Sequence, residues 1–211
     1  MLTATRRKVK IGPNDHGRKM SLKAFEFAEA EEGYHYELSR GYITVSDVAN
    51  YIHIHALIAA TIRDALSAYK FAHPGRIHLI LSSMECKLLM PEWESERHPD
   101  LAVYFTKPKG PKDRTMWRTW VPELVVEVVS ERSADRDYIE KRVEYWTLGV
   151  KEYWIVDAKR RQVLLLTRGK ADWTEKRLGL DGVCTTKLLP GFKLPCQVIA
   201  DAAAQAEEDA E

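Results

Sequence analysis

Hydrophobic positions recur along the chain with two different periods, and the two periods predict different elements. Residues 50–71 carry apolar side chains at near-helical spacing, and the sequence His-Pro-Gly follows at 73–75. This combination predicts a long helix with a stop. Residues 133–149 predict a second helix, with Ser133 as a candidate N-cap and Gly149 as its C-terminal stop.

Shorter apolar runs predict strands. Residues 35–45 read as two short strands around the turn 39–41, which is a hairpin signal. Residues 20–30 have enough apolar spacing for a short helix. Further extended segments are predicted at 77–90, 100–105, 122–130, 151–158 and 162–168, with more strands out to residue 194. This order of helices and strands predicts an α/β or α+β fold with a mixed sheet.

The two ends of the chain differ from its middle in charge. Residues 1–19 are polar and basic and are predicted to be a loose arm, whereas residues 200–211 contain five acids and no base. We expect this acidic tail to be a solvated helix end or disordered. One domain is therefore predicted over residues 20–199.

Composition sets limits on the class of protein. The chain has 211 residues, 45% of them hydrophobic, which suits one large globular domain. It has neither a stretch long and apolar enough to span a membrane nor the apolar segment of a secretory signal, so we expect it in the cytoplasm. Its three widely spaced cysteines indicate reduced, buried thiols rather than disulfides or a zinc site.

Glu127 interrupts the apolar run 124–129, which otherwise reads as a buried strand. Burying an unpaired carboxylate costs several kcal/mol, so such a residue is paired, protonated or bound to metal. If strands 100–105 and 122–130 pair in antiparallel fashion with Leu101 facing Val126, Asp100 lies opposite Glu127. Two carboxylates so close repel each other, and a hard divalent cation compensates them. A slip of one residue would place the two acids on opposite faces.

The second predicted helix adds a cation to these acids. One apolar stripe comprises Ile139, Val143 and Trp146; a second, with Lys141 in its middle, comprises Ala134, Tyr138, Tyr145 and Leu148. A helix that is apolar on both sides is largely covered, so we expect Lys141 to be shielded from solvent. Its long stem allows the ammonium to reach the pair of acids.

These residues carry a resemblance to a known family. The matching positions are Pro99-Asp100, Glu127-Val128-Val129-Ser130, Asp137 and Lys141, Tyr145, and Gly149-Val150-Lys151-Glu152-Tyr153-Trp154. The pattern resembles the PD-(D/E)XK nuclease superfamily, with its restriction-endonuclease-like fold, and is most similar to its Uma-type endonuclease family. Weaker matches at 36–41, at His55 and at 188–194 extend the resemblance over roughly residues 22–198.

The resemblance implies an Mg²⁺-dependent endonuclease that cleaves DNA, with Mn²⁺ as a substitute metal and a homodimer as an option. It implies metal ligation by Asp100, Glu127 and the carbonyl of Val128, with Glu37 as an additional site acid. The superfamily's lysine usually stands two residues after the acid, where this chain has Val129. The role therefore falls to Lys141 on the helix.

Structural alternatives remain open at each of these positions. Glu127 also fits a buried salt bridge with Lys141 or an arginine, and Asp100 fits a turn before the strand. His55 is either near the site or only a helix-end residue. Asp137 forms an i,i+4 pair with Lys141 and is expected to position it, whereas Tyr145 is expected in the core or the site wall.

A long loop after residue 105 is the candidate surface for nucleic acid. It carries two indoles, Trp117 and Trp120, and five bases: Lys107, Lys109, Lys112, Arg114 and Arg118. These residues suit phosphate tracking and base stacking, although a solvated hairpin tip has the same composition. The N-terminal Arg6, Arg7, Lys8 and Lys10 form a second candidate arm for phosphates.

Two other functions remain open. One is a nucleic-acid-binding or protein-interaction module that kept the fold without effective catalysis. The other is a metal hydrolase that acts on a different phosphoester.

Overall fold

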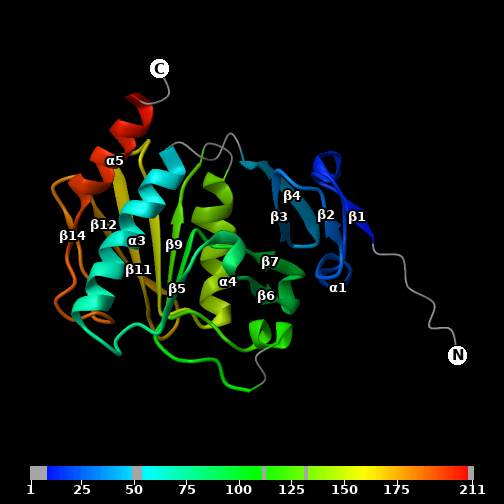
Figure 1. The fold of residues 1–211 in the computed structure, drawn as a ribbon, viewed down its shortest axis with the longest axis horizontal. Coiled ribbons are helices and arrows are strands. Elements are labelled where there is room, and N and C mark those ends of the chain that lie inside the picture. Colours follow the sequence, from blue (N-terminus) through cyan, green and yellow to red (C-terminus); the bar gives the residue numbers. More distant parts are fainter. Residues whose placement is uncertain (1–8, 49–53, 111–112, 131–132, 209–211) are drawn as a thin grey trace, which may run out of the picture. The chain divides into compact units, whose positions relative to one another are not determined.

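The computed structural model describes residues 9–48, 54–110, 113–130 and 133–208 (Figure 1). The chain forms two compact units, Met1–Tyr51 with Leu89–Arg97, and Ile52–Leu88 with His98–Glu211. The domain predicted over residues 20–199 spans parts of both units, and its boundaries stay a prediction.

The first unit is built on a four-stranded sheet with the strand order β4-β3-β7-β6. Its strands are β3 (Tyr34–Ser39), β4 (Tyr42–Asp47), β6 (Leu88–Met90) and β7 (Ser95–Arg97). Strands β3 and β4 form the predicted hairpin, with Ser39 paired to Tyr42. Its turn uses Arg40 and Gly41, which have φ of 49° and 79°. Glycine adopts this left-handed conformation without steric cost, which explains the tight turn.

Residues before this hairpin are more ordered than the sequence suggested. Strand β1 (Lys10–Ile11) pairs in parallel with β2 (Glu29–Ala30), and the 3-10 helix η1 (Pro13–Asp15) follows β1. Ile11 is buried, so the prediction of a loose arm is wrong for the described part of residues 1–19. Arg6, Arg7 and Lys8 lie outside the described residues.

The short helix predicted over 20–30 is also shorter than expected. Helix α1 (Leu22–Phe25) begins after Ser21, whose hydroxyl accepts a hydrogen bond from the Ala24 N–H. The chain then leaves the helix, because residues 29–30 pair with β1 as strand β2.

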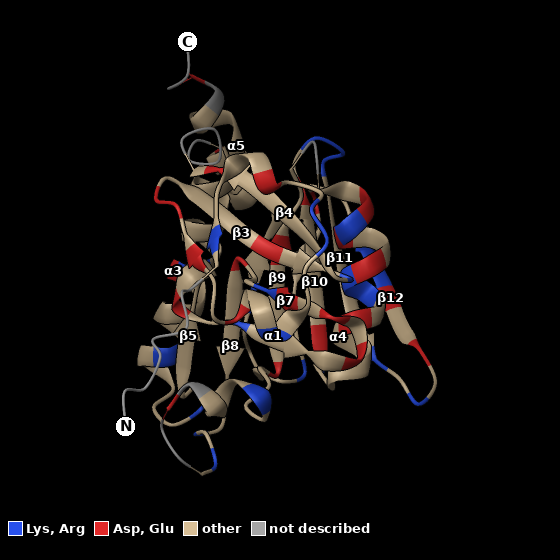
Figure 2. Cartoon of the chain, turned by 90° about the vertical axis from the view of Figure 1, so that its right-hand side faces the viewer, with Lys and Arg blue, Asp and Glu red and all other residues tan. Residues whose placement is uncertain are grey.

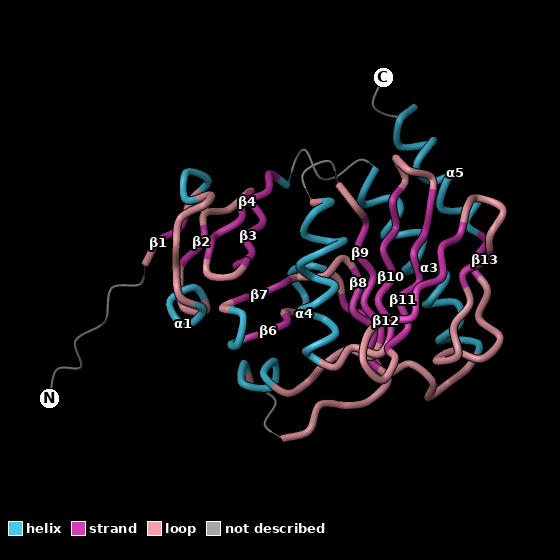
Figure 3. Tube along the Cα trace, turned by 180° about the vertical axis from the view of Figure 1, so that it is seen from behind, coloured by secondary structure: helices cyan, strands magenta, loops and turns pink. Residues whose placement is uncertain are grey.

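The second unit contains a six-stranded mixed sheet with the order β12-β11-β10-β9-β8-β5 (Figure 3). Its strands are β5 (Leu79–Leu81), β8 (Leu101–Tyr104), β9 (Leu124–Val128), β10 (Glu152–Asp157), β11 (Gln162–Arg168) and β12 (Trp173–Leu178). Strands β9 and β10 are parallel, and the other neighbours are antiparallel. The sequence predicted a strand in each of these regions, with β12 among the further strands expected between residues 169 and 194.

One face of this sheet is covered by helices α3 (Ile54–Ala72) and α5 (Cys196–Glu208), which lie side by side (Figure 1). Ile58, Ile62 and Leu66 of α3 are fully buried against Val126 and other apolar strand residues. Each such side chain contributes roughly 1.5–3 kcal/mol by burial. The predicted helix 50–71 is therefore present, and its described part forms one layer of the core.

The opposite face is covered by the π-helical segment η5 (Arg136–Glu140) and helix α4 (Lys141–Leu148). Successive residues of a strand point to opposite faces, so Glu127 faces this layer while Val126 and Val128 face α3. Helix α4 ends at Gly149, which has φ of 102°, as the sequence predicted.

Smaller elements complete the unit: the 3-10 helices η2 (Ser83–Glu85) and η4 (Arg114–Arg118), and the hairpin of β13 (Val183–Cys184) with β14 (Leu194–Pro195). The 3-10 helix η3 (Pro91–Trp93) belongs to the first unit. None of the helices in the described residues is long and apolar enough to cross a membrane.

The acidic tail is a helix over most of its length. Helix α5 extends to Glu208, and its Ala203 and Ala206 are buried. The described part of the tail is therefore a partly exposed helix end, which is one of the two predicted alternatives. Alanines at this spacing place one apolar stripe along α5, and Asp201 and Glu208 are exposed.

Cys86, Cys184 and Cys196 are buried free thiols, as predicted. Burial raises the pKa of the Cys86 and Cys184 thiols above the ordinary range, which disfavours the reactive thiolate. We expect the native protein to react slowly with Ellman's reagent and to release three thiols per chain in guanidinium chloride. Rapid labelling of the native protein would contradict this burial.

Candidate functional site

Strands β8 and β9 pair in the register that the sequence predicted. Leu101 lies opposite Val126 and Ala102 opposite Val125. Asp100 directly precedes β8, and its Oδ2 accepts a hydrogen bond of 2.6 Å from the Val128 N–H. Asp100 and Glu127 are 3% and 2% exposed, so two carboxylates are buried at the same edge of the sheet.

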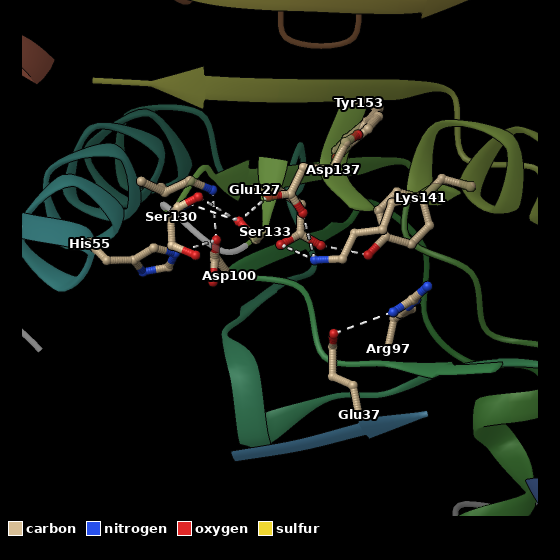
Figure 4. A network of polar contacts seen from close by, with 12 residues as sticks. Glu37, His55, Arg97, Asp100, Glu127, Ser130, Ser133, Asp137, Lys141 and Tyr153 are labelled. Atoms are coloured by element: carbon tan, nitrogen blue, oxygen red, sulfur yellow. Dashed lines mark hydrogen bonds and ion pairs between the residues drawn. The ribbon is translucent and has the colours of Figure 1, made fainter. Parts of the chain in front are cut away.

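A histidine from helix α3 holds the Asp100 side chain in place. His55, in the first turn of α3, places its Nε2 2.9 Å from Asp100 Oδ2. Because a carboxylate accepts hydrogen bonds, this ring nitrogen carries the proton that it donates. Thus His55 fixes the Asp100 side chain and is not merely a helix-end residue (Figure 4).

Glu127 meets the helix layer through both of its oxygens. Its Oε1 accepts a hydrogen bond of 2.5 Å from the Tyr145 hydroxyl, and its Oε2 lies 2.9 Å from the Nζ of Lys141. Lys141 is 5% exposed. The lysine therefore reaches the acid of the strand, as its position on the helix predicted.

Asp137 is the second carboxylate in contact with the Lys141 ammonium. Its Oδ1 lies 3.0 Å from Lys141 Nζ, and its Oδ2 accepts a 2.5 Å hydrogen bond from the Ser133 hydroxyl. The Tyr153 hydroxyl donates to the Asp137 backbone carbonyl, which anchors the helix to β10. The ammonium of Lys141 is therefore held between two buried carboxylates (Figure 4).

This contact with Asp137 spans an irregular turn of helix. Residues 136–140 form the π-helical segment η5, and Lys141 begins the regular helix α4. Single π-helical turns occur frequently at functional sites, because they change the phase of the residues on either side. The sequence predicted one continuous helix over 133–149 and gave no signal of this change.

Two residues of this network were assigned other roles from the sequence. Ser133 was expected as an N-cap, yet its hydroxyl accepts from the Ser130 N–H and donates to Asp137. Tyr153 was noted only as part of the matching motif at 149–154. The spacing of four residues between Ser133 and Asp137 is the signal that could have revealed their contact.

The fit to a divalent cation rests on the donor chemistry of two carboxylates. Mg²⁺ binds one or two carboxylates and keeps several waters, so Asp100 and Glu127 match its preference. No cluster of three or more His, Cys, Asp or Glu side chains in the described part of the chain is arranged to hold a metal. The carbonyl of Val128 as a further ligand stays a prediction.

Glu37 lies in the first unit, on β3. Its Oε2 is 3.5 Å from Nη1 of Arg97, a fully buried arginine that also donates to the Ser39 hydroxyl. These contacts explain why an acid is tolerated there. Its role as a site acid stays a prediction.

In the predicted nucleic-acid loop several cations are exposed, but one of the two indoles is buried. Lys107, Lys109 and Arg118 are exposed, whereas Lys112 lies outside the described residues and Arg114 begins η4. Trp120 is buried, stacks 3.9 Å from the ring of Tyr104, and donates its indole N–H to the carbonyl of Thr106. The prediction that Trp120 stacks on a base is therefore wrong, because its ring already belongs to the core.

One apolar stripe of the second helix is not covered. Ile139 and Val143 are 61% and 43% exposed, while Lys141 and Tyr145 face the sheet. Lys141 is shielded as predicted, yet the assumption of a helix covered on both sides was wrong. A helix that packs on one sheet buries the side toward that sheet and leaves the other in solvent.

We predict that Lys141→Met destabilises the fold by about 3–5 kcal/mol, because it leaves Glu127 and Asp137 buried without their cation. The double variant Lys141→Met with Glu127→Gln should recover part of that loss. Chemical denaturation of both single variants and the double variant measures the coupling. Lys151→Met, an exposed lysine, is the control. Additive effects in the double variant would contradict a direct Lys141–Glu127 interaction.

Comparisons with known proteins agree with this architecture. The nuclease described as "putative nuclease belonging to DUF820" from Anabaena variabilis ATCC 29413 has a similar structure, with a TM-score of 0.67 and 13% sequence identity. The match covers 87% of this chain and 99% of that chain, and at this identity it shows the fold alone. Curated proteins gave no match.

The profile of the Uma2 family, described as "Putative restriction endonuclease", matches residues 22–197. This match covers most of the chain, including both acids, Lys141 and the strands that hold them. The predicted restriction-endonuclease-like fold is thereby confirmed. The chain belongs to the Uma2 family of restriction-endonuclease-like proteins.

Proposed function

We propose that this protein is a metal-dependent nuclease that hydrolyses phosphodiester bonds of DNA. The observation that carries the proposal is the contact of Lys141 with Glu127, at 2.9 Å, beside Asp100 on the neighbouring strand. Because Val129 stands where the superfamily's lysine is usual, a lysine from the helix supplies the missing cation. Membership of an endonuclease family supports the same function.

Each residue then has a defined task. Asp100, Glu127 and the Val128 carbonyl would hold Mg²⁺ or Mn²⁺, which supplies Lewis-acid polarisation of the phosphate and activation of water. Lys141 orients the attacking water and stabilises negative charge on the phosphate by hydrogen bonding. His55 fixes Asp100, while Asp137 and Tyr145 fix Lys141 and Glu127.

Hydrolysis requires that the water oxygen bonds to phosphorus, that the bond to the leaving oxygen breaks, and that a proton reaches that oxygen. A protonated lysine donates hydrogen bonds and does not accept a proton. Lys141 held between two carboxylates is kept in this charged form, so we assign it to water orientation and charge stabilisation rather than to proton abstraction.

We predict that Asp100→Asn, Glu127→Gln and Lys141→Met each lower the cleavage rate by about 10²-fold or more, because each removes a charge that acts on the transition state. Cleavage of labelled DNA and RNA in Mg²⁺, Mn²⁺ and EDTA measures the effect. The control is Lys170→Met, on the exposed turn after β11. Unchanged activity in all three site variants would reject this site.

Metal binding gives an independent test. We predict that Glu127→Gln and Asp100→Asn weaken Mn²⁺ binding by about tenfold or more, since each removes a charged oxygen ligand. By contrast, Lys141→Met should strengthen it, because a cation that competes for Glu127 is removed. Titration calorimetry of the folded variants measures both effects. Equal affinity in all four proteins would show that the metal binds elsewhere or not at all.

A second function, a nucleic-acid-binding module without effective catalysis, is favoured by the contacts of the two acids. Both carboxylates already bind protein donors, and the described residues contain no cluster of three His, Cys, Asp or Glu side chains that could hold a metal. This alternative predicts no cleavage with either metal. It also predicts DNA binding that persists in the Asp100, Glu127 and Lys141 variants.

A further inference from the structure

The turn between β10 and β11 carries three consecutive cations, Lys159, Arg160 and Arg161, which the proposed site does not use. All three are exposed, and Lys and Arg are blue in Figure 2. The Arg161 N–H donates to the Ala158 carbonyl at 3.0 Å, and Arg161 adopts φ of 53°. The turn is therefore tight, and its backbone fixes where the side chains emerge.

Sheet topology places this turn at the same edge as the candidate site. Strand β10 runs parallel to β9, with Ile155 opposite Glu127 and Val156 opposite Val128. Parallel neighbours end at the same edge, about 4.8 Å apart. Because β10 ends at Asp157 and the chain then turns, Lys159 lies at most about 13 Å along the strand direction from the level of Glu127, at about 3.3 Å per residue. That span corresponds to a few nucleotides of one strand.

The turn is also fastened to the helix that holds Lys141. Tyr138 of η5 donates its hydroxyl to Asp157 Oδ2 at 2.8 Å, and the Arg160 N–H donates to Asp157 Oδ1 at 2.9 Å. The Arg160 guanidinium lies 5.3 Å from the centre of the Tyr138 ring. Burial raises the pKa of Tyr138, so its hydroxyl stays a donor. Arg160 thus holds the turn.

Lys159 and Arg161 line a cavity of about 430 Å³ between this turn and helix α5. Asp201 of α5 lines the same cavity and accepts a 2.8 Å hydrogen bond from Gln197. The volume falls within the range of small-molecule sites. Two cations favour an anion there, while Asp201 opposes it.

We propose that Lys159 and Arg161 form a phosphate-binding turn that contacts the backbone of the nucleic acid at the same edge of the sheet as the candidate site, on the side of the sheet that α5 covers. The inference rests on the proposed function, because it takes the same DNA as its ligand. It adds a contact surface that lies outside the long loop after residue 105.

The test measures DNA binding without cleavage. The binding constant for DNA falls as salt rises, and each phosphate contact contributes about 0.9 to the slope of log K against log salt. In a Glu127→Gln background, Lys159→Gln with Arg161→Gln should therefore reduce the magnitude of this slope by about 2. Fluorescence anisotropy with a 20-base-pair duplex measures this slope. Asp201→Asn should instead tighten binding, because it removes an acid from the cavity.

The matched control is Lys151→Gln with Lys170→Gln. These exposed lysines lie at the opposite ends of β10 and β11, so the same charge is removed from the other edge of the sheet. The control should keep the slope of the Glu127→Gln protein. Circular dichroism and thermal unfolding confirm that both double variants are folded.

An unchanged slope in the Lys159/Arg161 variant, or an equal decrease in the control, would overturn the proposal. So would full displacement of the duplex by millimolar inorganic phosphate, which indicates a site for free phosphate. If the turn variant loses binding while the wild type shows no cleavage with Mg²⁺ or Mn²⁺, the phosphate-binding turn stands and the nuclease function fails. If the wild type cleaves DNA and the Lys159/Arg161 variant has the same slope as the Glu127→Gln protein, the nuclease function is supported and the phosphate-binding turn is rejected.

Discussion

The buried contact of Lys141 with Glu127 and Asp137 is the constraint on which the second unit depends. A carboxylate in the middle of a core strand loses its hydration, and neighbouring donors must replace it. Lys141 and Tyr145 do so for Glu127, while His55 and the Val128 N–H do so for Asp100. Well-packed apolar residues often serve stability as well as a buried ion pair does. We therefore attribute this polar cluster to function rather than to stability.

The connection between β9 and β10 explains why a lysine on the helix can serve a strand acid. Parallel strands require a crossover, and here the crossover contains η5 and α4. The crossover begins where β9 ends, so its first turns lie over the edge that carries Glu127. Ser133 and Tyr153 fix Asp137, and Asp137 in turn fixes the lysine. Lys141 therefore brings a cation to Glu127 although the chain has no lysine two residues after that acid.

The sequence predicted those features that depend on local pattern. The period of the apolar residues located the strands, and the single polar break at Glu127 led to the correct register with β8. Burial of Lys141 followed from its place among apolar neighbours. These predictions succeeded because a strand shows its buried face directly in its sequence.

Other features depend on tertiary contacts that a single sequence does not reveal. Trp120 has the composition of a stacking platform, yet Tyr104 and Thr106 hold it in the core. Residues 10–11 look like a basic arm, yet their backbone pairs with β2. The π-helical turn likewise has no signature in the spacing of the residues that it displaces.

Charge balance connects the candidate site with its surroundings. Asp100, Glu127 and Asp137 contribute three carboxylates, against which Lys141 contributes one fixed cation. Such a site repels a phosphodiester at short range unless a metal is bound. For the proposed DNA substrate, the cations that attract its phosphates must therefore lie outside this cluster. Lys159 and Arg161, at the end of the strand next to Glu127, meet this requirement because the backbone of a tight turn holds them at the edge of the sheet.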